Sequence, residues 1–145
     1  MTSPVSTVLL VEDDANDVFF LRRAFQKAGL PYPLQDVSDG EKATAYLSGE
    51  PPYADRQQFP LPRLVMLDLK LPLKSGFEVL EWVRSQPCLK SLPVVILTSS
   101  NVPEDIAKAQ MLKADQYLVK PTSPTELVEI VKALAQTWLA PEPAK

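Results

Sequence analysis

The sequence has no histidine and only one cysteine, and each shortage excludes a class of chemistry. Without histidine, the chain has no imidazole base, no histidine metal ligand and no residue that could carry a phosphohistidine. The single thiol, Cys88, has no second cysteine with which to form an internal disulfide, which favours a reducing compartment. We therefore expect a cytoplasmic protein whose chemistry depends on side chains other than imidazole and thiol.

Long hydrophobic runs and a strong net charge are also absent. The uninterrupted apolar runs are only a few residues long, whereas a membrane-spanning helix needs about 20. Residues 1–4 contain no basic region and no long apolar core follows them, so no secretory signal is expected. The formal net charge of -3 gives no electrostatic basis for binding nucleic acid or an anionic membrane.

What is present is the composition of one globular domain. The chain has 145 residues, and 46% of them are hydrophobic. We expect a domain over residues 5–140, short tails at 1–4 and 141–145, and no output domain after it. Prolines gather in residues 50–63, a polar stretch longer than most connections in compact domains. A surface insertion is the favoured interpretation of this stretch, ahead of a partner-binding loop.

Five short apolar segments alternate with five segments of helical periodicity. The apolar segments predict strands over residues 7–11, 32–37, 64–68, 92–97 and 117–119. The periodic segments predict helices over about 17–28, 38–47 and 75–84, from about 102, and over about 123–139. This alternation predicts an α/β fold, a doubly wound five-stranded parallel sheet with helices on both faces. The strand order expected for it is 2-1-3-4-5, the flavodoxin-like order.

The start of the fourth helix carries a specific capping prediction. Either Ser100 or Asn101 is expected to cap it, and Glu104 is placed to close a capping box on Asn101.

Polar side chains stand at the ends of four predicted strands. They are Glu12-Asp13-Asp14 after the first, Asp68 after the third, Thr98 after the fourth and Lys120 after the fifth. The carboxyl ends of parallel strands lie along one edge of a sheet, so the predicted order brings all of them to one pocket. Each has an ordinary alternative when taken alone: a helix-capping cluster for the acidic triplet, a solvated turn for Asp68 and a helix cap for Thr98.

The charges of this group indicate what it binds. Neighbouring carboxylates repel one another, and a divalent cation such as Mg²⁺ relieves the repulsion. A Mg²⁺ ion held by one or two carboxylates typically also holds a phosphoryl oxygen. Lys120 and Thr98 offer a positive charge and a hydroxyl for further phosphoryl oxygens. Asp68, central in the row, is the best-placed nucleophile for forming an aspartyl phosphate.

These motifs together resemble the receiver domain of two-component response regulators. The resemblance rests on four stretches: 8–13 (Val-Leu-Leu-Val-Glu-Asp), 68–72 (Asp-Leu-Lys-Leu-Pro) with Gly76, 97–99 (Leu-Thr-Ser) and 117–121 (Tyr-Leu-Val-Lys-Pro). It extends over residues 5–139, nearly the whole chain. A receiver domain is a phosphoprotein that catalyses only its own phosphorylation and dephosphorylation, so no other enzyme activity is implied.

The resemblance assigns a role to each residue of the group. It makes Asp68 the phosphoacceptor, assisted by Lys120 and by Thr98, the switch hydroxyl. Tyr117 matches the switch aromatic that turns inward when the threonine moves to the phosphate. The implied Mg²⁺ ligands are Asp13 directly, Glu12 through water, Asp68 and the backbone carbonyl of Lys70. The implied partner is a sensor histidine kinase that carries the phosphohistidine.

A narrower resemblance is to the single-domain regulators paired with phytochrome histidine kinases of cyanobacteria and other bacteria. It rests on the Glu12-Asp13 pair, the proline-rich stretch 50–63, the stretch 97–100 and Trp138 near the end of the fifth helix. This subgroup tends to form dimers, so a homodimer is a further expectation. The chain departs from the receiver pattern at Lys113, where receivers commonly have glycine.

Three other functions compete with this interpretation. An aspartyl-phosphate phosphatase would place a second aspartate two residues after the nucleophile, where this chain has Lys70. A flavodoxin-like electron carrier would hold FMN phosphate in a Ser/Thr/Gly loop after the first strand, where this chain has three acidic residues. An adaptor with a receiver fold that works without phosphorylation is the third possibility, although the complete site argues against it.

Overall fold

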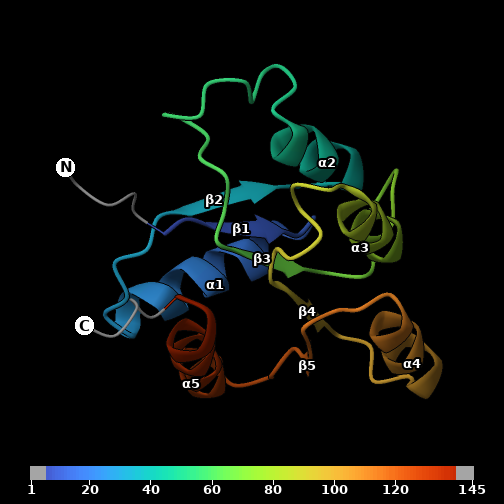
Figure 1. The fold of residues 1–145 in the computed structure, drawn as a ribbon. Helices are drawn as coiled ribbons and strands as arrows, with labels where there is room; N and C mark the ends of the chain where they lie inside the picture. The colour runs from blue at the N-terminus through green and yellow to red at the C-terminus, as the bar shows by residue number, and fades with distance from the viewer. Residues whose placement is uncertain (1–5, 140–145) are drawn as a thin grey trace, which may run out of the picture.

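A computed structural model describes residues 6–139. Five strands and five α-helices alternate along the described chain, followed by one π-helical turn (Figure 1). The strands are β1 (Val8–Val11), β2 (Leu34–Val37), β3 (Leu64–Leu67), β4 (Val94–Thr98) and β5 (Gln116–Val119). The helices are α1 (Ala15–Lys27), α2 (Gly40–Ser48), α3 (Gly76–Ser85), α4 (Pro103–Met111), α5 (Pro124–Leu134) and the π-helix η1 (Ala135–Leu139).

All strand pairs are parallel, and the order is β2-β1-β3-β4-β5, which confirms the predicted α/β architecture. Val11 at the end of β1 pairs with Val37 of β2 and with Leu67 of β3. Thr98 at the end of β4 pairs with Val119 of β5. The carboxyl ends of the strands are therefore aligned at one edge of the sheet, as the site requires.

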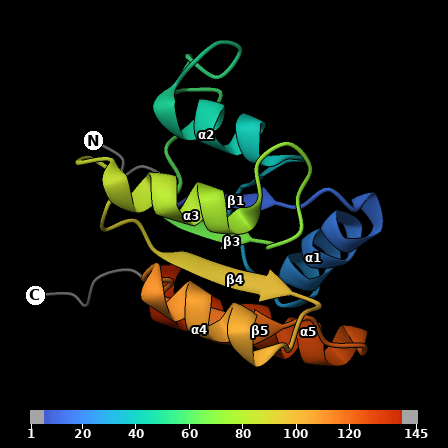
Figure 2. The same cartoon turned by 90° about the vertical axis from the view of Figure 1, so that its right-hand side faces the viewer.

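Alternating residues of the strands point into two separate apolar layers. Leu9 and Val11 of β1 pack in the layer formed with α2, α3 and α4. Val8 and Leu10 pack in the layer formed with α1 and α5. Figures 1 and 2 show the resulting three-layer arrangement, with the sheet between the two groups of helices. Because β1 and β3 are buried on both faces, their sequences read as continuous apolar runs.

One prediction about a helix end was wrong. No capping box forms at α4: its N-cap is Val102, which makes no side-chain hydrogen bond. The Ser100 hydroxyl instead donates to the carboxylate of Asp105 in the first turn of α4 (2.6 Å) and accepts from the N–H of the N-cap Val102 (3.3 Å), so it contacts the helix start without being its cap. The fifth helix reaches Leu139 as predicted, although its last turn is π-helical rather than α-helical.

The proline-rich stretch is anchored to α2 by one guanidinium group. Arg56 donates to the carbonyl oxygens of Tyr46 (2.8 Å), Leu47 (3.0 Å) and Phe59 (3.1 Å). The rings of Tyr46, Tyr53 and Phe59 also pack against one another. The carbonyls near the end of α2 thereby gain the partners that a helix C-terminus lacks.

Within residues 6–139, none of the helices combines the length and the apolar character needed to cross a bilayer. The expected domain limits, residues 5 and 140, and both expected tails lie outside the described residues.

Candidate functional site

Backbone hydrogen bonds continue one residue beyond the strands and place the polar side chains. The N–H of Glu12 donates to Val37 (3.1 Å), and the N–H of Asp68 donates to Val11 (3.0 Å). At the other side of the site, the N–H of Lys120 donates to Thr98 (2.8 Å). The sheet itself therefore positions the group that the sequence predicted.

The chain after Asp68 folds back closely over the strand end. Gly76, the first residue of α3, donates its N–H to the Leu69 carbonyl (3.0 Å). A Cβ at Gly76 would collide with the backbone of Asp68 and Leu69. Only glycine allows α3 to begin this close to Asp68. Asp14 caps α1 by accepting from Asn16 (2.8 Å), so the third acid of the triplet serves the helix.

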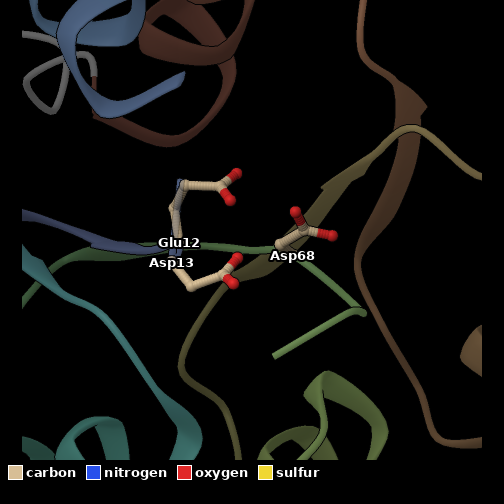
Figure 3. A group of neighbouring side chains, drawn as sticks. All are labelled: Glu12, Asp13 and Asp68. Atoms are coloured by element: carbon tan, nitrogen blue, oxygen red, sulfur yellow. The ribbon is translucent and has the colours of Figure 1, made fainter. Parts of the chain in front are cut away.

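Three carboxylates gather where β1 and β3 end. Glu12, Asp13 and Asp68 each offer a carboxylate oxygen, and these oxygens all lie within 4.8 Å of one another (Figure 3). Glu12 and Asp68 are buried, with 5% and 6% of their surface exposed, whereas Asp13 is open to solvent. Clustered oxygen ligands with one open side suit a hard divalent cation, which keeps several waters.

Lys120 is the cation of the site, and it contacts three carboxylates. Its Nζ lies 2.6 Å from Glu12, 2.7 Å from Asp17 and 2.7 Å from Asp68. Asp13, grouped with Glu12 and Asp68, brings the number of acidic side chains at the site to four. The carboxylates outnumber the lysine, which leaves the pocket short of positive charge and favours a metal ion there.

Burial and neighbouring charges shift the pKa values of this group. Burial is the main cause that raises the pKa of Glu12 to about 7, with the Asp68 charge adding to it and Lys120 opposing. Burial also disfavours ionisation of Asp68, but hydrogen bonding to Lys120 and its charge outweigh that effect and lower the Asp68 pKa. The pKa of Lys120 is raised, because the hydrogen bonds that it donates to Asp17, Asp68 and Glu12 outweigh the cost of burial. Lys120 is therefore held in its charged form.

Thr98 is fully buried, and within the described residues its hydroxyl has no hydrogen-bond partner. A buried hydroxyl without a partner costs free energy and needs an explanation. Thr98 makes a minor contribution to lowering the Asp68 pKa, although the two side chains do not meet hydrogen-bond geometry. The Thr98 hydroxyl is thus available to a group that would enter between them, as a phosphoryl oxygen would.

Two predicted site residues lie around this centre. The Lys70 N–H donates to the Asp68 carboxylate (3.2 Å), while metal binding by its carbonyl stays a prediction. The Tyr117 hydroxyl donates to the Ser100 carbonyl (2.9 Å), so the aromatic side chain is tied to the loop before α4. Its switch role likewise stays a prediction.

Sequence reasoning missed Asp17. Asp17 lies in the first turn of α1, four residues after Asp13, and it belongs to no motif quoted above. The only signal for it was its position at the start of the helix predicted directly after the acidic triplet, close along the chain to the end of the first strand.

Comparisons with known proteins agree with this geometry. Residues 8–132 match the model of the response regulator receiver domain family. Response regulator Rcp1 from Synechocystis sp. is 33% identical over 138 residues, which cover 95% of this chain and 92% of Rcp1. The Mn²⁺-bound crystal structure of Rcp1 has a TM-score of 0.82 at 33% identity and covers 96% of this chain and 99% of that one.

Two other solved structures are also similar. The phosphorylated cyanobacterial phytochrome response regulator RcpA has a TM-score of 0.86 and 36% identity, covering 97% of this chain and 100% of its own. Response regulator RPA3017, from red light signaling of R. palustris, has a TM-score of 0.89 and 33% identity, with the same coverage. The predicted resemblance to phytochrome-associated regulators is confirmed.

Proposed function

Because this chain belongs to the response regulator receiver domain family, whose members are not classical enzymes, we propose that it is the phosphoacceptor of a two-component phosphorelay. Asp68 takes the phosphoryl group from a phosphohistidine on a partner kinase, since this chain has no histidine. The observation that carries the proposal is the buried Asp68 carboxylate, which contacts the Lys120 ammonium and belongs to an acidic group suited to a metal. The Thr98 hydroxyl nearby has no hydrogen-bond partner among residues 6–139.

The proposed metal is Mg²⁺, which the acidic group fits by its oxygen ligands and by its shortage of positive charge. Asp13, Asp68 and the Lys70 carbonyl would hold it directly, and Glu12 through a water. When bound, the ion supplies neutralisation of the charge on the phosphoryl oxygens. The Mn²⁺ in the Rcp1 structure supports a divalent cation in such a site.

The residues of the chain supply the remaining steps. An Asp68 carboxylate oxygen attacks the phosphorus in line, the P–O bond forms, and the P–N bond to the partner's imidazole breaks with its electron pair on nitrogen. Lys120 turns from the Asp68 carboxylate to a phosphoryl oxygen, and the Thr98 hydroxyl donates to another. The new group adds a charge of roughly -1.5 to -2, which draws both side chains inward.

The proposed output is a change of the surface formed by α4, β5 and α5. As Thr98 moves, the Tyr117 ring follows into the space it leaves, which requires release of its bond to Ser100. Likeness to Rcp1, RcpA and RPA3017 supports a phytochrome-type sensor histidine kinase in the cytoplasm as the partner. A homodimer would offer one route for the signal, and Trp138, half-buried with its indole N–H donating to Gln116 (3.2 Å), lies on that surface.

The test is phosphorylation by a small phosphoryl donor, followed by intact-mass measurement. With Mg²⁺ we expect one phosphoryl group per chain, released by hydroxylamine as an acyl phosphate is, and no labelling after removal of Mg²⁺ with EDTA. Asp68→Asn should abolish labelling, while Asp14→Asn, at an acid that caps α1, should not. Labelling that survives Asp68→Asn would contradict the site, and no labelling of the wild type would favour a phosphorylation-independent adaptor.

The proposed coupling to assembly needs a separate measurement. Light scattering after size exclusion, with and without beryllofluoride plus Mg²⁺, compares the molar mass of the two states. A mass that does not change would remove phosphorylation-dependent dimerisation from the proposal while leaving phosphotransfer intact.

A further inference from the structure

Lys120 makes three close ion pairs in the described structure, and those with Asp17 and Asp68 are also hydrogen bonds. An ammonium group has three N–H donors, and its three carboxylate partners are Glu12, Asp17 and Asp68, at 2.6–2.7 Å. Three directed contacts fix a long, flexible side chain, which otherwise keeps considerable rotamer freedom. Lys120 is also only 18% exposed, so it is held rather than solvated.

The three partners differ in what else they can bind. Glu12 and Asp68 belong to the acidic group whose oxygens lie within 4.8 Å of one another, and Asp17 does not. A cation in that group competes with Lys120 for the charge of Glu12 and Asp68. Asp17 alone among the three partners stays available to the ammonium.

The start of α1 holds Asp17 in a favourable position for a carboxylate. Asp17 lies in the first turn of α1, where its N–H and that of Asn16 are both capped by Asp14. A carboxylate is favourable at this end of a helix. Its side chain is 34% exposed, against 7% for Asp68 and 4% for Glu12, and it lies 2.7 Å from Lys120 Nζ.

We propose that Asp17 is a positioning residue, which keeps the Lys120 ammonium beside Asp68 when a metal takes the charge of Glu12 and Asp68. This inference rests on the proposed phosphoacceptor function. Without the Asp17 carboxylate, Lys120 would be held loosely at the moment when it must contact the phosphoryl group. Correct placement of a charged group is a large part of catalysis of phosphoryl transfer.

The experiment compares Asp17→Asn with Asp14→Asn at saturating Mg²⁺. Both substitutions remove one negative charge from the same end of α1, and asparagine still caps a helix. We expect the rate of phosphorylation by a small donor to fall about fivefold in Asp17→Asn, as for loss of one partly buried ion pair, and to stay within about twofold in Asp14→Asn. Removal of a negative charge alone would make phosphorylation faster in both variants, since a less negative site repels an anionic donor less.

A second measurement asks whether the effect passes through Lys120. The ¹⁵N resonance of its ammonium, assigned by its loss in Lys120→Met, is expected in Mg²⁺-loaded wild type and Asp14→Asn and is expected to disappear in Asp17→Asn. A rate within twofold of wild type, or a resonance that persists in Asp17→Asn, would overturn the inference. If the wild type is not phosphorylated, the proposed function fails, and the resonance still reports whether Asp17 holds Lys120.

Discussion

The centre of the sheet and its β5 edge are anchored to different extents. Next to central β3, α3 buries Val79, Leu80 and Val83, and the Ser75–Glu78 capping box closes its start. Before β5, the edge strand, α4 buries only Ala109 and its N-cap makes no side-chain hydrogen bond. β3 is buried along its length, whereas the ends of β5 are exposed.

The pocket contains residues from both the centre of the sheet and its β5 edge. The difference in packing matches the different roles proposed for these residues. Asp68 extends from β3, the firmly packed part, so the proposed acceptor has a fixed position. Lys120 and Tyr117 come from β5, and the loop with Ser100 precedes α4. Elements that respond to a signal come from the less stable parts of a structure. The groups proposed to move are therefore placed where movement costs less.

The largest expected difference is between the losses of unfolding free energy when apolar side chains of α3 and α4 are truncated. Leu80→Ala should lower the free energy of unfolding by about 3 kcal/mol, since Leu80 is fully buried. Ile106→Ala in α4 should cost about 1 kcal/mol, because Ile106 is half-exposed. Urea denaturation measures both. Equal losses would show that α4 is packed as firmly as α3 and would remove the basis of the comparison.

The second largest expected effect concerns the anchoring of the proline-rich stretch 50–63. Arg56→Ala removes three hydrogen bonds to the carbonyls of Tyr46, Leu47 and Phe59, and we expect a loss of about 2 kcal/mol, reduced by partial exposure. Arg23→Ala is the control, because Arg23 is exposed on α1 and should change stability by about 0.5 kcal/mol or less. Thermal unfolding followed by circular dichroism compares them, and a loss no larger than that of Arg23→Ala would mean that the stretch is not held by Arg56.

Much of the pocket could be predicted because its position follows from the backbone. Apolar runs buried on both faces identify β1, β3 and β4, and the polar residue after each run lies at the strand end. Once the strands are parallel and ordered, the backbone positions of Glu12, Asp68, Thr98 and Lys120 lie along one edge of the sheet.

The features that the sequence did not predict depend on side-chain contacts. Their partners are either far apart in the sequence or one of several that a side chain could bind. The contact between Asp17 and Lys120 spans 103 positions and depends on how α1 is oriented against β5. At α4, Ser100 and Asn101 both looked like caps, but the Ser100 hydroxyl is taken by Asp105. Sequence spacing identifies residues able to cap and does not say which partner they take.

A smaller effect is expected at the contact between β5 and the loop before α4. Tyr117→Phe removes the hydrogen bond to the Ser100 carbonyl and should lower the free energy of unfolding by about 1 kcal/mol. Tyr32→Phe is the matched control, since its hydroxyl donates to the Leu139 carbonyl over a longer 3.3 Å and should cost less. Hydrogen exchange should show faster opening of α4 in Tyr117→Phe and not in Tyr32→Phe. Equal exchange rates in the two variants would show that the Tyr117 hydroxyl does not stabilise α4.

The smallest effect should be a gain in stability. Lys113 follows α4 with φ of +70°, in the left-handed region that glycine adopts without a Cβ penalty. Lys113→Gly should therefore raise the free energy of unfolding by about 0.5 kcal/mol or more, while its carbonyl still accepts from Arg84. Lys108→Gly, inside α4, should instead cost about 1 kcal/mol. If Lys113→Gly destabilised the protein as Lys108→Gly does, the left-handed turn between α4 and β5 would not lower the stability of this edge of the sheet.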